Sequence, residues 1–116
     1  MISYDKAHDL SKVLSSSTEY QALSVARKLL ETDESAKKMV KDFMVKQMEL
    51  QMEVMSGKPE DKAKTEAIQK MLELLKYNPK AWEFIQAHFR FQQIMADVYK
   101  IINDAVGEGM DLFGKQ

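Results

Sequence analysis

The sequence of 116 residues contains no cysteine. This absence excludes disulfides within the chain, thiolate zinc sites, cysteine-ligated iron–sulfur clusters and thiol catalysis. The N-terminal segment MISYDKAHDL lacks the apolar stretch of a signal peptide. No apolar run approaches the roughly 20 residues that a membrane-spanning helix needs. We therefore expect a cytoplasmic protein that makes no contact with a membrane.

An excess of charge of one sign is also missing. The chain has 17 basic and 18 acidic residues, for a net charge of −1. A balanced chain gives no global electrostatic attraction to nucleic acid or to an anionic membrane. Apolar residues make up 45% and charged residues 30%, as in ordinary globular proteins. The length suits one domain, and we expect residues 1–116 to form it.

Glycine and proline are scarce, with four and two copies, and most of them mark breaks between segments. No segment alternates in the way a strand does, and the segments between breaks have helical periodicity. The sequence therefore predicts an all-α fold of about five helices. The expected helices are residues 3–13, a second helix capped by Thr18, a third from Thr32 or Asp33 to Met55, a fourth over residues 60–76 and a fifth from Pro79 to about Val106.

Three short motifs predict how these helices begin and end. In SGKPE, Gly57 suits the position just after a helix, and Pro59 suits the first turn of the next one. In YNPK, Asn78 is the expected N-cap and Pro79 the first helical residue. The segment GEG, residues 107–109, is expected to end the fifth helix. The predicted architecture is a long helical hairpin followed by a long C-terminal helix.

The second half of the third predicted helix carries two apolar stripes, although a helix that packs on one neighbour needs one. The first stripe is Ala36, Val40, Phe43, Gln47, Leu50 and Val54, and the second is Val45, Met44, Met48, Met52 and Met55. Methionine adapts to irregular surfaces and is frequent at interfaces. Either another helix of this chain or a second protein covers the methionines. The polar start of the fourth helix, EDKAKTEA, favours the second interpretation, because an exposed patch of this size promotes aggregation.

The fifth predicted helix also has two adjacent apolar seams, which indicates a central helix packed from two sides. A two-fold axis would use one such surface twice, so a homo-oligomer, either a dimer or a tetramer, is expected. Other regulatory proteins are a further class of expected partner. The predicted interface residues are Met44, Met48, Met52, Met55, Phe84, Phe91, Ile94 and Val98.

Residues arranged for catalysis are not found. The two histidines, His8 and His88, have no partner at metal-binding spacing, and no glycine-rich phosphate loop or nucleophile elbow is present. We expect His88 to be a hydrogen-bonded core or interface residue, with a pH-dependent contact as the alternative. We expect no enzymatic activity, no metal and no cofactor.

A lysine-rich face of the third helix leaves a second function open. Lys37, Lys38, Lys41 and Lys46 form a local basic cluster. The simpler interpretation is a solvated helix face. The alternative function is that of an RNA-associated protein, although the aromatic residues that stack on single-stranded bases are missing from this cluster.

Two segments resemble a known family. The segment Asp33–Gln51, with its pattern of Asp33, Ala36, Phe43 and Gln47, is similar to the signature of the YlbF/YmcA family, most closely its YheA-like branch. The segment NPKAWEFIQAHFRFQQIMADVYKIINDAV resembles the long C-terminal helix of that family, and the likeness covers nearly the whole chain.

The resemblance implies an all-helical bacterial cytosolic protein that self-associates through long helices. The better-studied relatives act without enzymatic activity, as regulatory adaptors that form complexes, influence mRNA processing through an endoribonuclease and affect competence, sporulation and biofilm formation. This chain departs from them in two respects. It has no cysteine, whereas relatives that carry iron–sulfur clusters hold them with cysteines, and it has His88 where many relatives have glutamate.

Overall fold

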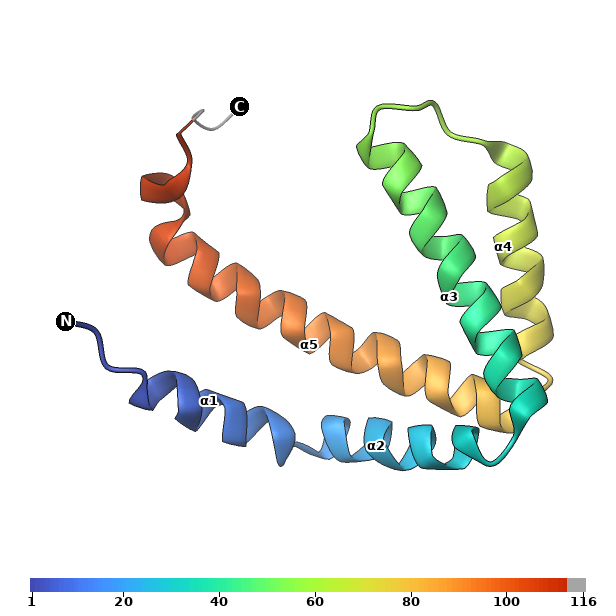
Figure 1. Ribbon diagram of the computed structural model, residues 1–116, viewed down its shortest axis with the longest axis horizontal. Coiled ribbons are helices and arrows are strands. Elements are labelled where there is room, and N and C mark those ends of the chain that lie inside the picture. The colour runs from blue at the N-terminus through green and yellow to red at the C-terminus, as the bar shows by residue number, and fades with distance from the viewer. Residues whose placement is uncertain (113–116) are drawn as a thin grey trace.

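The computed structural model describes residues 1–112, which form five α-helices and no strand. The helices are α1 (Asp5–Ser15), α2 (Thr18–Glu31), α3 (Glu34–Met55), α4 (Lys62–Leu75) and α5 (Pro79–Met110). Figure 1 shows two arms that meet at one end: α1, α2 and α5 form one arm, and the α3–α4 hairpin forms the other. The all-α prediction and the predicted order of helices are confirmed.

Polar side chains start four of the five helices. The side chain of Asn78 accepts a hydrogen bond from the backbone N–H of Ala81 at 3.3 Å, and that of Asp33 accepts one from Ala36 at 3.0 Å, as expected of N-caps. Asp61 does the same for α4. The prediction for Thr18 is wrong, because Ser17 has the extended backbone of an N-cap and accepts from Tyr20. Helix α1 also lies two residues later than expected.

The turn after α3 forms around Gly57. Its φ of +88° is in the left-handed region that favours glycine. The N–H of Gly57 donates to the carbonyl of Val54, and the N–H of Lys58 donates to that of Glu53, each at 3.1 Å. These two bonds are those of a Schellman motif, so the predicted helix stop is confirmed. The prediction for Pro59 is wrong, because α4 begins only at Lys62 and Pro59 lies in the connecting loop.

Helix α5 continues through the two glycines that were expected to end it. It runs to Met110, and the N–H of Asp111 donates to the carbonyl of Gly107 at 3.0 Å. Glycine is a weak helix former, but it ends a helix sharply only where it takes a positive φ, and Gly57 is the one described glycine that does. The helix has 32 residues, which corresponds to about 48 Å.

The hydrophobic core lies where the two arms meet. Its buried members are Leu30, Ala36, Val40, Phe43, Leu75, Ala81 and Ile85. The first half of α5 is packed from two sides: the ring centroids of Phe89 and Phe43 on α3 are 6.4 Å apart, and those of Phe91 and Tyr20 on α2 are 5.2 Å apart. This arrangement confirms a central position for the first half of α5 and leaves its second half outside the core.

The molecule is open and flat, with extents of 50 × 39 × 15 Å. Its radius of gyration is 17.9 Å, whereas a compact domain of this length has about 13 Å. The chain exposes 9498 Å², whereas a compact monomer of 13.4 kDa exposes roughly 6,500 Å². The surplus is therefore about 3,000 Å² of surface that a compact fold of the same mass would bury.

Candidate interaction surfaces

The first candidate surface is formed by methionines on the second half of α3. Met48, Met52 and Met55 are 57%, 63% and 80% exposed, and Val45 beside them is exposed as well. We call these four residues the methionine surface. Met44, one turn earlier, is half-buried against the core. Of the two interpretations of the methionine stripe, packing against the same chain therefore applies to Met44 and not to the other methionines.

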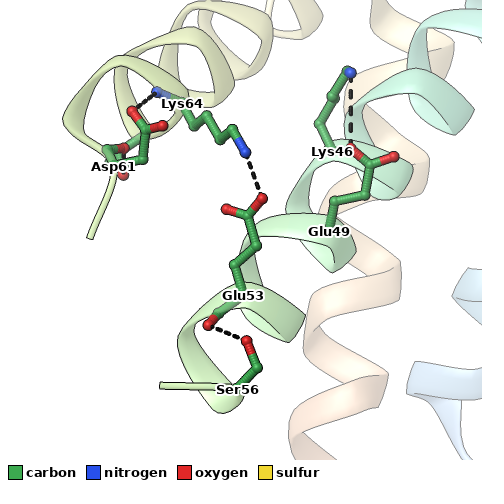
Figure 2. Close-up of polar contacts among 7 residues, drawn as sticks. Lys46, Glu49, Glu53, Ser56, Asp61 and Lys64 are labelled. Carbon is green, nitrogen blue, oxygen red and sulfur yellow. Dashed lines mark hydrogen bonds and ion pairs between the residues drawn. The ribbon is translucent and has the colours of Figure 1, made fainter. Parts of the chain in front are cut away.

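Helix α4 leaves the methionine surface open because it packs on nearly the opposite side of α3. Leu50 of α3 faces Ile68 and Met71 of α4. Glu53 and Lys64 form an ion pair across the hairpin (Figure 2). Lys46 and Glu49 form another along α3, with 3.8 Å between Nζ of the lysine and Oε2 of the glutamate. At 100° per residue, Leu50 points about 180° away from the centre of the methionine surface, and Glu53 about 120° away.

The tip of the hairpin is held by local polar contacts. Figure 2 shows the Ser56 hydroxyl donating to the carbonyl of Glu53 at 2.9 Å and Asp61 accepting from the N–H of Lys64 at 3.2 Å. The hydrogen bond with Glu53 raises the pKa of Lys64. Of these contacts, the bond between Lys64 and Glu53 joins the start of α4 to the end of α3, in the hairpin that presents the methionine surface.

The second candidate surface lies on the second half of α5. Its members are Met95, Tyr99, Ile101, Ile102 and Val106, which we call the distal α5 surface. Tyr99 and Ile101 are 71% and 70% exposed, and the other three are also exposed. Helix α1 contacts α2 and no other helix, so it does not cover this surface. Figure 1 shows α1 and the distal part of α5 running apart from one another.

The predicted interface residues on α5 occupy different environments. Phe84 packs against the core and Phe91 against Tyr20, so both have contacts within the chain. Ile94 and Val98 are half-buried and border the distal α5 surface. The predicted set ended at Val98 and omitted the more exposed residues beyond it. The signal for them was in both apolar seams, because Ile101 continues the seam of Ile94 and Val98, whereas Tyr99, Ile102 and Val106 lie on the adjacent seam.

His88 is held by rings rather than by hydrogen bonds. Its ring stacks on that of Phe84, with 5.7 Å between the ring centroids, and meets the ring of Phe89 edge-on, with 5.8 Å between the centroids. Burial lowers its pKa. It also lines a shallow groove with Ser24 and Arg27 of α2. Among the described residues no hydrogen bond to its side chain is found, so the expected hydrogen-bonded histidine is instead an aromatic-stacked one.

The basic cluster on α3 is largely neutralised. Lys37 pairs with Glu31 at 2.7 Å, Lys38 with Asp42 at 3.7 Å, and Lys46 with Glu49 at 3.8 Å. Ion pairs such as these reduce the attraction of the lysines for phosphate. The structure therefore gives the RNA-associated alternative no specific support.

Residues 1–112 contain neither a metal-binding cluster of acidic and histidine side chains nor a helix that could cross a membrane. No cluster of three histidine, aspartate or glutamate side chains there could hold a metal ion. No helix in that range is both long and apolar enough to cross a membrane.

Comparison with known proteins identifies the family of this chain. The family described as "Control of competence regulator ComK, YlbF/YmcA" matches residues 3–107. The chain belongs to the YlbF/YmcA family. The resemblance seen in the sequence is thereby confirmed.

Relatives in this family match along most of their length. A UPF0342 protein of Desulfitobacterium hafniense (strain Y51) is 34% identical over 89% of this chain and 83% of its own. A UPF0342 protein of Bacillus velezensis is 33% identical over 97% of this chain and 95% of its own. A solved structure, a protein of unknown function (DUF964) from Bacillus stearothermophilus, superposes with a TM-score of 0.73 at 23% identity and covers 95% of this chain and 96% of its own. The last comparison supports the fold.

Proposed function

We propose that this protein is a non-catalytic interaction module, a homo-oligomeric regulatory adaptor of the YlbF/YmcA type. The observation that carries the proposal is the surplus surface of the single chain together with two apolar surfaces that its own helices leave uncovered. The family description, which names control of a competence regulator, supports a regulatory role. Developmental regulation and RNA processing are the settings that the sequence resemblance implies for such an adaptor.

The amount of surplus surface matches that of an obligate assembly. A standard protein–protein interface buries about 800 Å² on each partner, and obligate interfaces bury more. A surplus of about 3,000 Å² on one chain thus corresponds to more than one standard interface. An adaptor needs two surfaces, one for its own assembly and one for its target.

The methionine surface is the surface assigned to self-association. It lies at the outer end of the hairpin, where a two-fold axis can bring two hairpins together and use one patch twice. Methionine side chains adapt to the opposing surface without strain. The distal α5 surface is on a different helix and remains for another protomer or a target protein.

Charge introduced into the methionine surface tests the proposal. Met48→Glu combined with Met52→Glu should lower the mass measured by light scattering after size-exclusion chromatography, because burying a carboxylate without a partner is unfavourable. The control adds the same charge elsewhere on exposed residues, as Gln69→Glu combined with Gln86→Glu, and should keep the wild-type mass. Circular dichroism checks that both variants remain helical.

A gentler variant keeps the test decisive if the glutamates prevent folding. Met48→Gln combined with Met52→Gln preserves side-chain length and should weaken assembly, so that dissociation occurs at a higher protein concentration than for wild type. An unchanged mass for folded variants of both kinds would refute the assignment of self-association to the methionine surface.

A further inference from the structure

The distal α5 surface has edges of unequal charge. Helical periodicity places Asp97, Asp104 and Glu108 along one edge of its apolar residues. All three side chains are exposed. The opposite edge holds Gln92, Ala96 and Asn103, which carry no charge. The apolar face is thus bordered by carboxylates on one side only.

The acidic edge keeps a net negative charge in the folded chain, because the ion pair of Lys100 with Asp104 offsets one of its three carboxylates. From Asp97 to Glu108 the sequence has three carboxylates, which are those of the acidic edge, and one basic residue, Lys100. Lys100 pairs with Asp104 at 2.9 Å, from the side of the helix away from the apolar face. Asp97 accepts a hydrogen bond from the neutral side chain of Gln93 at 2.9 Å, which leaves its charge in place.

This distribution of charge disfavours pairing of two α5 helices in antiparallel orientation. If a second copy lay antiparallel on the same apolar face, its acidic edge would lie beside the acidic edge of the first. Like charges along the edges of a helical seam select against a pairing, and opposite charges select for it. A helix that complements this surface therefore carries an apolar stripe that is bordered by lysine or arginine side chains.

We infer that the distal α5 surface binds an amphipathic helix of a partner protein, one with basic residues along the edge of its apolar stripe. The apolar residues Tyr99, Ile101 and Ile102 supply the buried contact. Asp97, Asp104 and Glu108 supply orientation and selectivity. This inference rests on the proposed adaptor function, because it names the chemistry of the target that the self-associated protein would hold.

Two synthetic helical peptides provide the probe. They share one leucine stripe and one length, and differ only in carrying lysines or glutamates along one edge of the stripe. Each is labelled with a fluorophore, and its binding to the full chain is followed by anisotropy at low and at physiological salt. We expect the lysine peptide to bind at least about tenfold more tightly at low salt, with a smaller ratio at higher salt.

Variants of the chain identify the groups responsible. Asp97→Asn, Asp104→Asn and Glu108→Gln together should bring the binding of the two peptides to near equality. The matched control removes three exposed carboxylates of α4 and its preceding loop, as Glu60→Gln, Glu66→Gln and Glu73→Gln, and should keep the wild-type ratio. Ile101→Gln combined with Ile102→Gln should weaken the binding of both peptides.

Three results would overturn the inference: equal binding of both peptides to wild type, no binding of either, or the same loss of selectivity in the control variant. These results are separate from the test of self-association. The Met48→Glu and Met52→Glu variant should still bind the lysine peptide, and the variant lacking the acidic edge should keep the wild-type mass. Failure of one proposal can thus be told from failure of the other.

Discussion

At the scale of single residues, the junction of the two arms depends on Phe43. Its side chain is 1% exposed and lies against Phe89. It comes from α3, while the other residues of its core cluster come from α2, α3, α4 and α5. Because the buried core is small, few other contacts can compensate for its loss.

Phe43→Ala should lower the free energy of unfolding by about 3–5 kcal/mol, the usual cost of removing a buried phenylalanine. Phe43→Leu, which keeps most of the volume, should cost clearly less. Urea unfolding followed by circular dichroism measures both. A loss below about 1 kcal/mol for the alanine variant would contradict the assigned core.

His88 gives a pH-dependent prediction. Burial lowers its pKa in the folded chain, so the unfolded chain binds the proton more readily. The contribution of the neutral ring is therefore present above the usual histidine pKa and is lost as pH falls below it. An NMR titration should place the His88 midpoint below the value of a free histidine, and His88→Asn should reduce the loss of stability between pH 7 and pH 5. A midpoint at or above the free value would contradict the stacked environment.

The sequence predicted some buried residues and not others. The stripe of Ala36, Val40 and Phe43 was clear from spacing, because Glu34, Lys37 and Lys41 occupy the adjacent arc in the first half of α3. On α5 both seams are apolar, so periodicity alone could not tell which one α2 covers. Phe84 and Phe91 were therefore assigned to an intermolecular surface, although the structure gives both of them contacts inside the chain.

At the scale of helices and turns, the sequence was most informative where a structure depends on neighbouring residues. The caps of Asp33 and Asn78 join a side chain to a backbone N–H three residues later, so the motif contains the whole interaction. The end of α5 was predicted wrongly because glycine permits a helix stop without requiring one. Whether a glycine ends the helix depends on the backbone φ angle that it takes.

Two glycine substitutions should have opposite effects for this reason. Gly57→Ala should destabilise the hairpin by roughly 1–2 kcal/mol, because alanine at φ +88° is strained. Gly109→Ala meets no atom within 4 Å and should stabilise the last turn of α5. Hydrogen exchange should be faster around residues 54–62 in the first variant and slower around residues 107–111 in the second. Equal effects of the two substitutions would contradict the assigned backbone geometry.

At the scale of the whole molecule, the open arrangement of the arms could not be predicted from the sequence. Periodicity shows that α3 and α5 carry more apolar surface than one neighbour can cover. It does not show that α4 packs opposite the methionine surface or that α1 leaves distal α5 free. These features depend on the directions in which short turns send the chain, and they produce the surplus of about 3,000 Å².

The central claim is that this chain completes its burial of apolar surface by assembly. Sedimentation equilibrium of the unmodified protein, from nanomolar to high micromolar concentration, tests the claim most directly. We expect a mass of at least twice 13.4 kDa at micromolar concentration, with dissociation only on strong dilution. A stable particle of 13.4 kDa at every concentration would contradict the claim.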